Sequence, residues 1–156
     1  MAPRKKAKKA KKARAARRPA RRARAASSKG LAFGSVSPSF TVNDLMKSLA
    51  WYRDVIGFEP GERWERDGQL MGVELKAGKS YFMIGQDDWK KGRDRKKGEG
   101  FRIYCTTTQD IDAIAAGIKA RGGQLDSEPK DQEWGVRDIS LTDPDGFKIT
   151  IAREIK

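Results

Sequence analysis

The side chains that carry most enzyme chemistry are scarce in this chain. Its 156 residues include no histidine and one cysteine, Cys105. A reactive cysteine needs a base or a cation that lowers its pKa. With no imidazole to do so, an inert and buried Cys105 is favoured over a nucleophile. A single cysteine also excludes an internal disulfide and fits a reducing cytoplasm.

Carboxylates are the remaining candidates for acid–base work. Glu62, Glu65 and Glu74 fall on strand-like segments, and nothing in their spacing brings two of them together. Alternation along a strand predicts that Glu65 and Glu74 face a binding cavity, where they would complement a cationic ligand. We therefore assign no catalytic residue from the sequence.

The N-terminal segment carries the net charge of the chain. Residues 1–30 hold fourteen Lys and Arg and no acid, whereas the other residues hold twenty basic and twenty-one acidic side chains. We expect this Lys/Arg/Ala-rich tail to be disordered when free, because like charges repel and alanine buries little. A dense polycation binds nucleic acid through counterion release, without reading sequence. The candidate contacts are Lys5, Lys6, Lys8, Lys9, Lys11, Lys12, Arg17, Arg18, Arg21 and Arg22. A merely solubilising extension is the alternative.

The sequence offers no membrane partner. No apolar run reaches the length that crosses a bilayer, and the basic start lacks the apolar stretch of a secretory signal. We expect a cytoplasmic protein, with nucleoid association through the tail.

The elements that position these side chains occur twice. A helical pattern begins after Asp44 and ends at Gly57, and a second begins after Asp110 and ends at Gly123. Asp suits a helix N-cap and Gly suits the turn that ends a helix. Both pairs are thirteen residues apart, and the two copies are offset by sixty-six.

Each helical pattern follows one strand and precedes three. The predicted strands after the helices are 60–66, 70–76 and 80–85, then 124–128, 136–141 and 147–152, with a DPDG turn at 143–146. Val73, Leu75, Ile139 and Leu141 alternate toward the core. The fold class is therefore α+β, built from two βαβββ modules that form curved mixed sheets around a cavity.

We divide the chain into a tail (1–30) and one domain (31–156), with modules at 35–86 and 100–156 and a charged linker at 86–99. A solvated face is the favoured interpretation of this linker; the alternative is that it extends the tail's attraction for phosphate.

The domain resembles the vicinal oxygen chelate superfamily of glyoxalases, bleomycin-resistance proteins and extradiol dioxygenases. The resemblance rests on TVNDLMKSLAWYRDVIGFEPG (41–61), DIDAIAAGIKARGG (110–123) and EPKDQEWGVRDISLTDPDGFKITI (128–151). It implies paired modules around a shared cavity and a homodimer.

The resemblance also implies four metal-ligand positions, which here fall on Ser37, Met83, Ile103 and Thr150. Hydroxyls bind divalent metals weakly, isoleucine does not bind them and methionine suits soft Cu(I). We therefore predict no metal and no other cofactor, which makes metal-dependent glyoxalase or dioxygenase activity improbable.

The predicted cavity wall is small and mostly neutral. Alternation places Phe147, Ile149 and Ile151 in the core. The wall then consists of Ser37, Ser39, Thr41, Met83, Ile103, Cys105, Thr107, Lys148 and Thr150. The resemblance adds Trp64, Trp89 and Trp134 as side chains that stack on a ligand, with ordinary packing as the alternative. Trp51, on the first helix, is assigned to packing.

Three functions stay open. The leading hypothesis is metal-free binding of a flat small molecule, including sequestration of an antibiotic. The second is an enzyme of the same superfamily, a lyase, isomerase or dioxygenase-related protein, working without a metal or with an organic cofactor. The third is a nucleoid-associated accessory protein that acts through its tail.

Overall fold

The computed structural model describes residue 31 and residues 33–155. The predicted tail and its candidate nucleic-acid contacts, from Lys5 to Arg22, lie outside this part of the chain. Ser35–Lys156 form one compact unit. Within the described residues, no helix is both long and apolar enough to span a bilayer.

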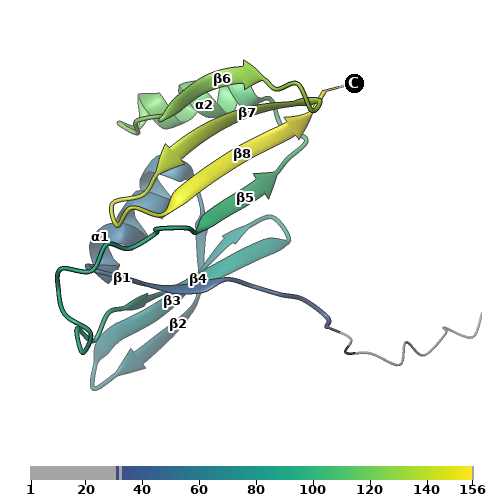
Figure 1. Cartoon of the computed structure of the whole chain (residues 1–156). Coiled ribbons are helices and arrows are strands. Elements are labelled where there is room, and N and C mark those ends of the chain that lie inside the picture. Colours follow the sequence, from purple (N-terminus) through teal and green to yellow (C-terminus); the bar gives the residue numbers. More distant parts are fainter. Residues whose placement is uncertain (1–30, 32, 156) are drawn as a thin grey trace, which may run out of the picture. The chain divides into compact units, whose positions relative to one another are not determined.

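The compact unit contains the two predicted βαβββ modules (Figure 1). Each module forms a four-stranded mixed sheet in which the first strand pairs in parallel with the last, in the orders β1-β4-β3-β2 and β5-β8-β7-β6. Module 1 comprises β1 (Ser39–Val42), α1 (Leu45–Ala50), η1 (Trp51–Ile56), β2 (Glu59–Arg66), β3 (Gln69–Ala77) and β4 (Ser80–Gln86). Module 2 comprises β5 (Arg102–Thr106), α2 (Ile111–Ala120), β6 (Ser127–Asp131), β7 (Val136–Thr142) and β8 (Lys148–Glu154).

Both helices begin after the predicted caps; the first ends before Gly57 as predicted, whereas α2 ends at Ala120, three residues before Gly123. The Asp44 carboxylate accepts a hydrogen bond from the backbone N–H of Lys47 at 3.0 Å, and Asp110 accepts one from Ala113 at 2.8 Å. These bonds satisfy amides that the first helical turn leaves unpaired. The left-handed backbone of Gly57, with φ of +101°, ends the first helix. The pattern did not reveal that this helix continues as a π-helix from Trp51 onward.

The edge strand of the second sheet begins later than predicted. The sequence places it at 124–128, whereas β6 runs from Ser127 to Asp131. Leu125, the apolar residue behind the prediction, packs against the core before regular pairing begins. The register with β7 then shifts between Ser127 and Lys130, around Pro129. Proline has no N–H to donate, so it belongs in an edge strand or at such an irregularity.

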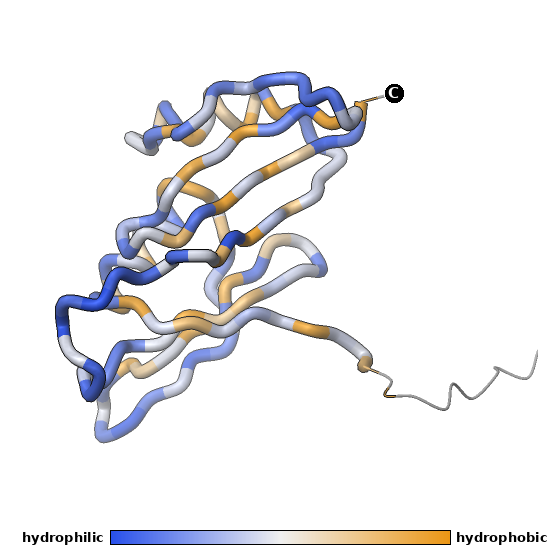
Figure 2. The backbone as a smooth tube through the Cα atoms, viewed as in Figure 1, coloured by the Kyte–Doolittle hydropathy of each residue, from blue (hydrophilic) through white to orange (hydrophobic). Residues whose placement is uncertain are grey.

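Each sheet buries one face under its helix. The alternating residues Val73, Leu75, Ile139 and Leu141 are all fully buried, as predicted. They join one apolar cluster with the inward side chains of α1, η1 and α2. Figure 2 shows the resulting alternation of hydrophobic and hydrophilic residues along the strands. We call the other face of each sheet, turned away from its helix, the open face.

The DPDG turn joins the two modules. The buried Tyr52 hydroxyl, on η1, donates to Asp143 at 2.8 Å, and the Ser48 hydroxyl donates to Asp145 at 2.8 Å. Phe40 and Phe147 pack across the modules with ring centroids 4.2 Å apart. Burial is the main cause that raises the pKa values of both Asp143 and Tyr52. The predicted turn is therefore also an anchor for the helix of module 1.

Candidate functional site

The open face of the first sheet carries several of the predicted ligand contacts. Ser39 and Met83 are register partners, and Glu74 is the next residue in the same row. Trp64 pairs with Gly72 on the neighbouring row, and a Cβ placed on Gly72 would lie 3.1 Å from the Trp64 ring. The indole therefore lies over the glycine, with 37% of its surface exposed.

Other side chains of this face are already engaged. Glu74 lies on the open face, where its carboxylate is 3.0 Å from the Lys76 ammonium. This pairing leaves little charge for a cationic ligand. Ser37 precedes β1, and a hydrogen bond with Tyr81 is the main cause that lowers the pKa of the Tyr81 hydroxyl.

The open face of the second sheet presents a row of hydroxyl groups. Tyr104, Thr150, Ser140 and Ser127 are successive register partners across the four strands. The Thr150 and Ser140 hydroxyl oxygens lie 3.3 Å apart. The adjacent row brings Arg102 beside Lys148. Hydroxyls and two cations thus share this face.

The predicted face of Ile103 and Cys105 is wrong. Ile103 is the register partner of Ile149, and Cys105 that of Ile151, so both share the face of core residues rather than that of Thr150. Ile103 is buried in the apolar cluster, and Cys105 packs against it. Burial raises the pKa of the Cys105 thiol, which disfavours the reactive thiolate, as predicted. The two side chains belong to the core side of the sheet.

Thr150, the position expected to hold a metal ligand, instead accepts a hydrogen bond from a positively charged side chain. The Arg102 guanidinium donates to the Thr150 hydroxyl at 2.6 Å, and Thr150 is 4% exposed. The register partner of Thr150 is Tyr104, a phenol, and the first sheet offers Ser39 and Met83. A positive charge and neutral donors suit a dication poorly. Within the described residues, no three His, Cys, Asp or Glu side chains could share a metal ion. The residues present do not fit the family's divalent metal.

The remaining predicted tryptophans lie in different settings. Trp89 lies in the segment between β4 and β5, which Figure 2 shows as largely hydrophilic, and the Arg93 guanidinium lies 4.5 Å from its ring centroid. Trp134 lies between β6 and β7 and is 69% exposed. Trp51 packs edge-on against Tyr52 with centroids 5.0 Å apart.

The segment between β4 and β5 is fixed by a buried carboxylate. Asp87 is 4% exposed and forms ion pairs with Lys97 and Arg95. The Trp89 backbone N–H also donates to it, at 2.8 Å. The hydrogen bond from Lys97 is the main cause that lowers the pKa of Asp87 to about 2. Some charged side chains of this linker therefore form ion pairs with one another, so the linker is not only a solvated face.

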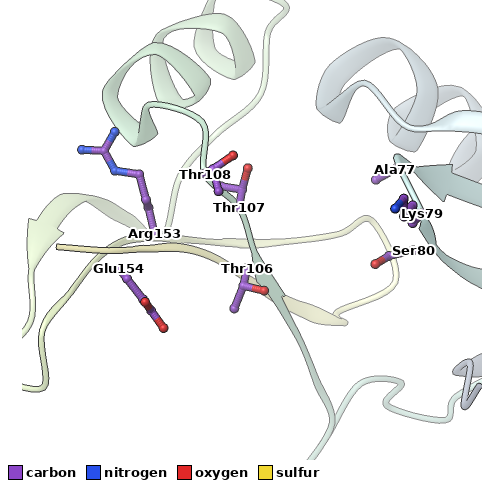
Figure 3. Close-up of a pocket in the computed structure, with 8 residues that line it drawn as sticks. All are labelled: Ala77, Lys79, Ser80, Thr106, Thr107, Thr108, Arg153 and Glu154. Atoms are coloured by element: carbon purple, nitrogen blue, oxygen red, sulfur yellow. The ribbon is translucent and has the colours of Figure 1, made fainter. Parts of the chain in front are cut away.

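The cavities do not collect the predicted contacts in one place. A cavity of about 850 Å³ lies between the turn that joins β3 to β4 and the end of β5 (Figure 3). Of the predicted wall, only Thr107 lines it, beside Thr106 and Thr108. Cys105 and Thr107 line a neighbouring cavity of about 520 Å³. Lys148 lines a third cavity, of about 430 Å³, with Phe101 and Arg102.

Sequence reasoning missed Phe101, Arg102 and Tyr104. The resemblance placed a ligand position at Ile103, and alternation from Ile103 then assigned Cys105 to the same face. The signal was present in the strand itself. The sequence RIYCT alternates polar and apolar side chains, and it assigns Arg102 and Tyr104 to the open face.

Comparisons with known proteins agree with this fold. The family model "Glyoxalase/Bleomycin resistance protein/Dioxygenase superfamily" matches residues 34–151. Bleomycin resistance proteins of Geobacillus stearothermophilus and Staphylococcus aureus are 26% identical over 128 residues, which cover 76% of this chain and 96% of theirs.

Solved structures of the superfamily align over most of their length. A member from Sphaerobacter thermophilus has a TM-score of 0.60 and 26% identity, and the match covers 77% of this chain and 98% of that protein. A glyoxalase/bleomycin resistance protein/dioxygenase from Nocardioides has a TM-score of 0.64 at 14% identity, with 82% and 88% covered. The chain belongs to the glyoxalase/bleomycin resistance protein/dioxygenase superfamily.

Proposed function

We propose that this chain binds a flat small molecule on the open faces of its sheets without a metal and without breaking a bond. The observation that carries the proposal is the Arg102–Thr150 hydrogen bond, which fills a family ligand position with a cation and a neutral hydroxyl. The open faces offer hydroxyls and aromatic rings, which hold and orient a molecule but do not attack it.

Stacking on Trp64 supports a planar ligand. Its ring rests on Gly72 and leaves part of its surface accessible. Trp89 and Trp134 stay candidate contacts, although Trp89 is already stacked by Arg93. A protein of this kind would lower the free concentration of its ligand by mass action, and this is how it would confer resistance to an antibiotic.

We also propose that the working form is a homodimer. Several large apolar side chains are exposed on a single chain, among them Tyr104 at 52% and Phe101 at 37%. A second copy would cover part of this surface and enclose the ligand. Sedimentation or light scattering at micromolar concentration tests this: a mass of two chains supports the proposal and a mass of one chain contradicts it.

Ligand binding is tested with full-length protein and a panel of planar antibiotics. Relatives of this chain are named for bleomycin resistance, so bleomycin is the first compound to test. Calorimetry with and without a chelator should give the same affinity in both conditions. Failure of every compound to bind would refute the function. Turnover of a bound compound that survives the chelator would favour the enzyme alternative.

The polycationic tail supports a second proposal, contact with nucleic acid. Its fourteen basic residues, without one acid, favour salt-sensitive and nonspecific binding. The full chain and a chain beginning at Ser28 should be compared on DNA at rising salt. Loss of retention in the shorter chain supports the proposal, and equal retention by both removes the tail from this function.

A further inference from the structure

The cavity lined by Phe101, Arg102 and Lys148 combines two cations with an aromatic ring. It measures about 430 Å³, within the range of small-molecule sites. Arg102 and Lys148 are register partners on the open face of the second sheet, so their side chains leave the sheet side by side. Phe101 forms an apolar wall and is anchored by Phe40 and Phe147, at centroid distances of 5.7 and 5.8 Å.

The two cations are available to a ligand. Within the described residues, the Arg102 side chain hydrogen bonds to the neutral Thr150 hydroxyl and forms no ion pair. Lys148 has only distant partners, the Asp126 carboxylate at 3.7 Å and the Thr142 hydroxyl at 3.5 Å. The third basic residue of the cavity, Lys97, is already paired with Asp87. The one carboxylate that lines the cavity, Glu99, is largely exposed and lies 3.8 Å from Lys96.

The rim of the cavity is held in a fixed position. Gly98 approaches Gly146 so closely that a Cβ on Gly98 would lie 2.2 Å from the Gly146 carbonyl oxygen. The buried Asp87–Lys97 pair anchors the same segment immediately before Gly98. The backbones of the linker and of the DPDG turn thus contact each other and close one end of the cavity. Such a preorganised wall lowers the cost of ordering the site on binding.

We infer that this cavity binds the anionic group of the ligand, a carboxylate or a phosphate, while the ring of the ligand lies against Phe101. The inference rests on the proposed function and makes it specific, because it gives the ligand a negative charge. Two adjacent cations favour an anion where Arg102 has no carboxylate partner among the described residues and Lys148 has only the long ion pair with Asp126. On the first sheet, by contrast, the acid of the open face is neutralised by Lys76.

Three probes with the same ring test the charge. These are 2-naphthoate, 2-naphthyl phosphate and 2-naphthylmethylammonium, measured by calorimetry on the full chain at about 0.15 M salt. At least one anion should bind about tenfold or more tightly than the ammonium probe, and the tighter anion identifies the preferred group. Equal affinities for anions and cation would overturn the anion inference but leave ligand binding intact. No binding of any of the three probes would also overturn the anion inference, and the antibiotic panel alone then decides the proposed function.

Substitutions locate the anion. Lys148→Met and Arg102→Met should each weaken binding of the tighter anion by about tenfold and should not weaken binding of the ammonium probe. Lys148→Arg should retain the preference. Lys130→Met removes an exposed lysine of the same sheet outside the cavity and is the matched control. Because the basic tail is present in every variant, its attraction for anions is the same throughout. Undiminished anion binding by both methionine variants would overturn the assignment.

Discussion

Trp64→Ala is the substitution that most directly probes stacking on the open face. Trp64 exposes 37% of its surface, which for a side chain of about 250 Å² leaves about 90 Å² for a ligand to cover. At about 25 cal/mol per Å², the lost contact is worth about 2 kcal/mol, or about thirtyfold in affinity. Trp64 lies on β2, the edge strand of its sheet, so we expect the fold to tolerate the substitution.

Calorimetry with a planar antibiotic that binds the full chain is the suitable assay, since tryptophan fluorescence itself changes with the substitution. Trp51→Phe is the matched control, because Trp51 packs against Tyr52 on the helix and not on the open face. The control should alter stability and leave affinity unchanged. Gly72→Ala, whose added carbon would press on the Trp64 ring, should shift the ring and weaken binding without removing it. An unchanged affinity in Trp64→Ala, in protein whose circular dichroism matches the wild type, would refute stacking on this face.

Other predictions concern the framework of the site. Tyr52→Phe leaves one oxygen of the buried Asp143 carboxylate without its donor and should cost about 1–3 kcal/mol of unfolding free energy in urea; no loss would deny the turn its anchoring role. Because the pKa of Asp87 falls to about 2 in the folded chain, against about 3.9 when unfolded, its contribution to stability should be present above pH about 4 and fade toward pH about 2. Asp87→Asn should be less stable than the wild type, and this stability difference, measured from urea midpoints across this pH window, should shrink as the pH falls. A stability difference that does not change with pH would contradict the lowered pKa of Asp87. Gly98→Ala should destabilise the chain more than Gly92→Ala, since both glycines have positive φ but only Gly98 abuts backbone; equal thermal midpoints would contradict the close approach.

The elements of this fold were readable from local signals. The caps at Asp44 and Asp110, the glycine after the first helix and the alternation around Val73 and Ile139 each depend on a few neighbouring residues. Such short-range patterns determine where helices and strands begin, and their repetition in the chain indicated two modules.

The side-chain arrangement of the site was less readable, because it depends on pairing between strands. Which face Ile103 occupies follows from its register with Ile149, and the family resemblance, which carries no register, placed it on the opposite face. The Arg102–Thr150 hydrogen bond joins residues forty-eight apart, and the Asp87 pairs fold a linker that composition alone presents as solvated. The alternation of RIYCT was the one local clue to the cations of the open face.

The proposed function requires this chain to hold its ligand without the divalent metal that the family resemblance implies. Native mass spectrometry tests it most directly, on full-length protein dialysed against zinc, nickel and manganese and then loaded with the naphthalene probe that binds most tightly. We expect the mass of protein plus ligand, with no retained metal and with the same ligand occupancy after a chelator. One metal ion per chain, whose removal also releases the ligand and whose binding is lost in Thr150→Ala, would contradict it.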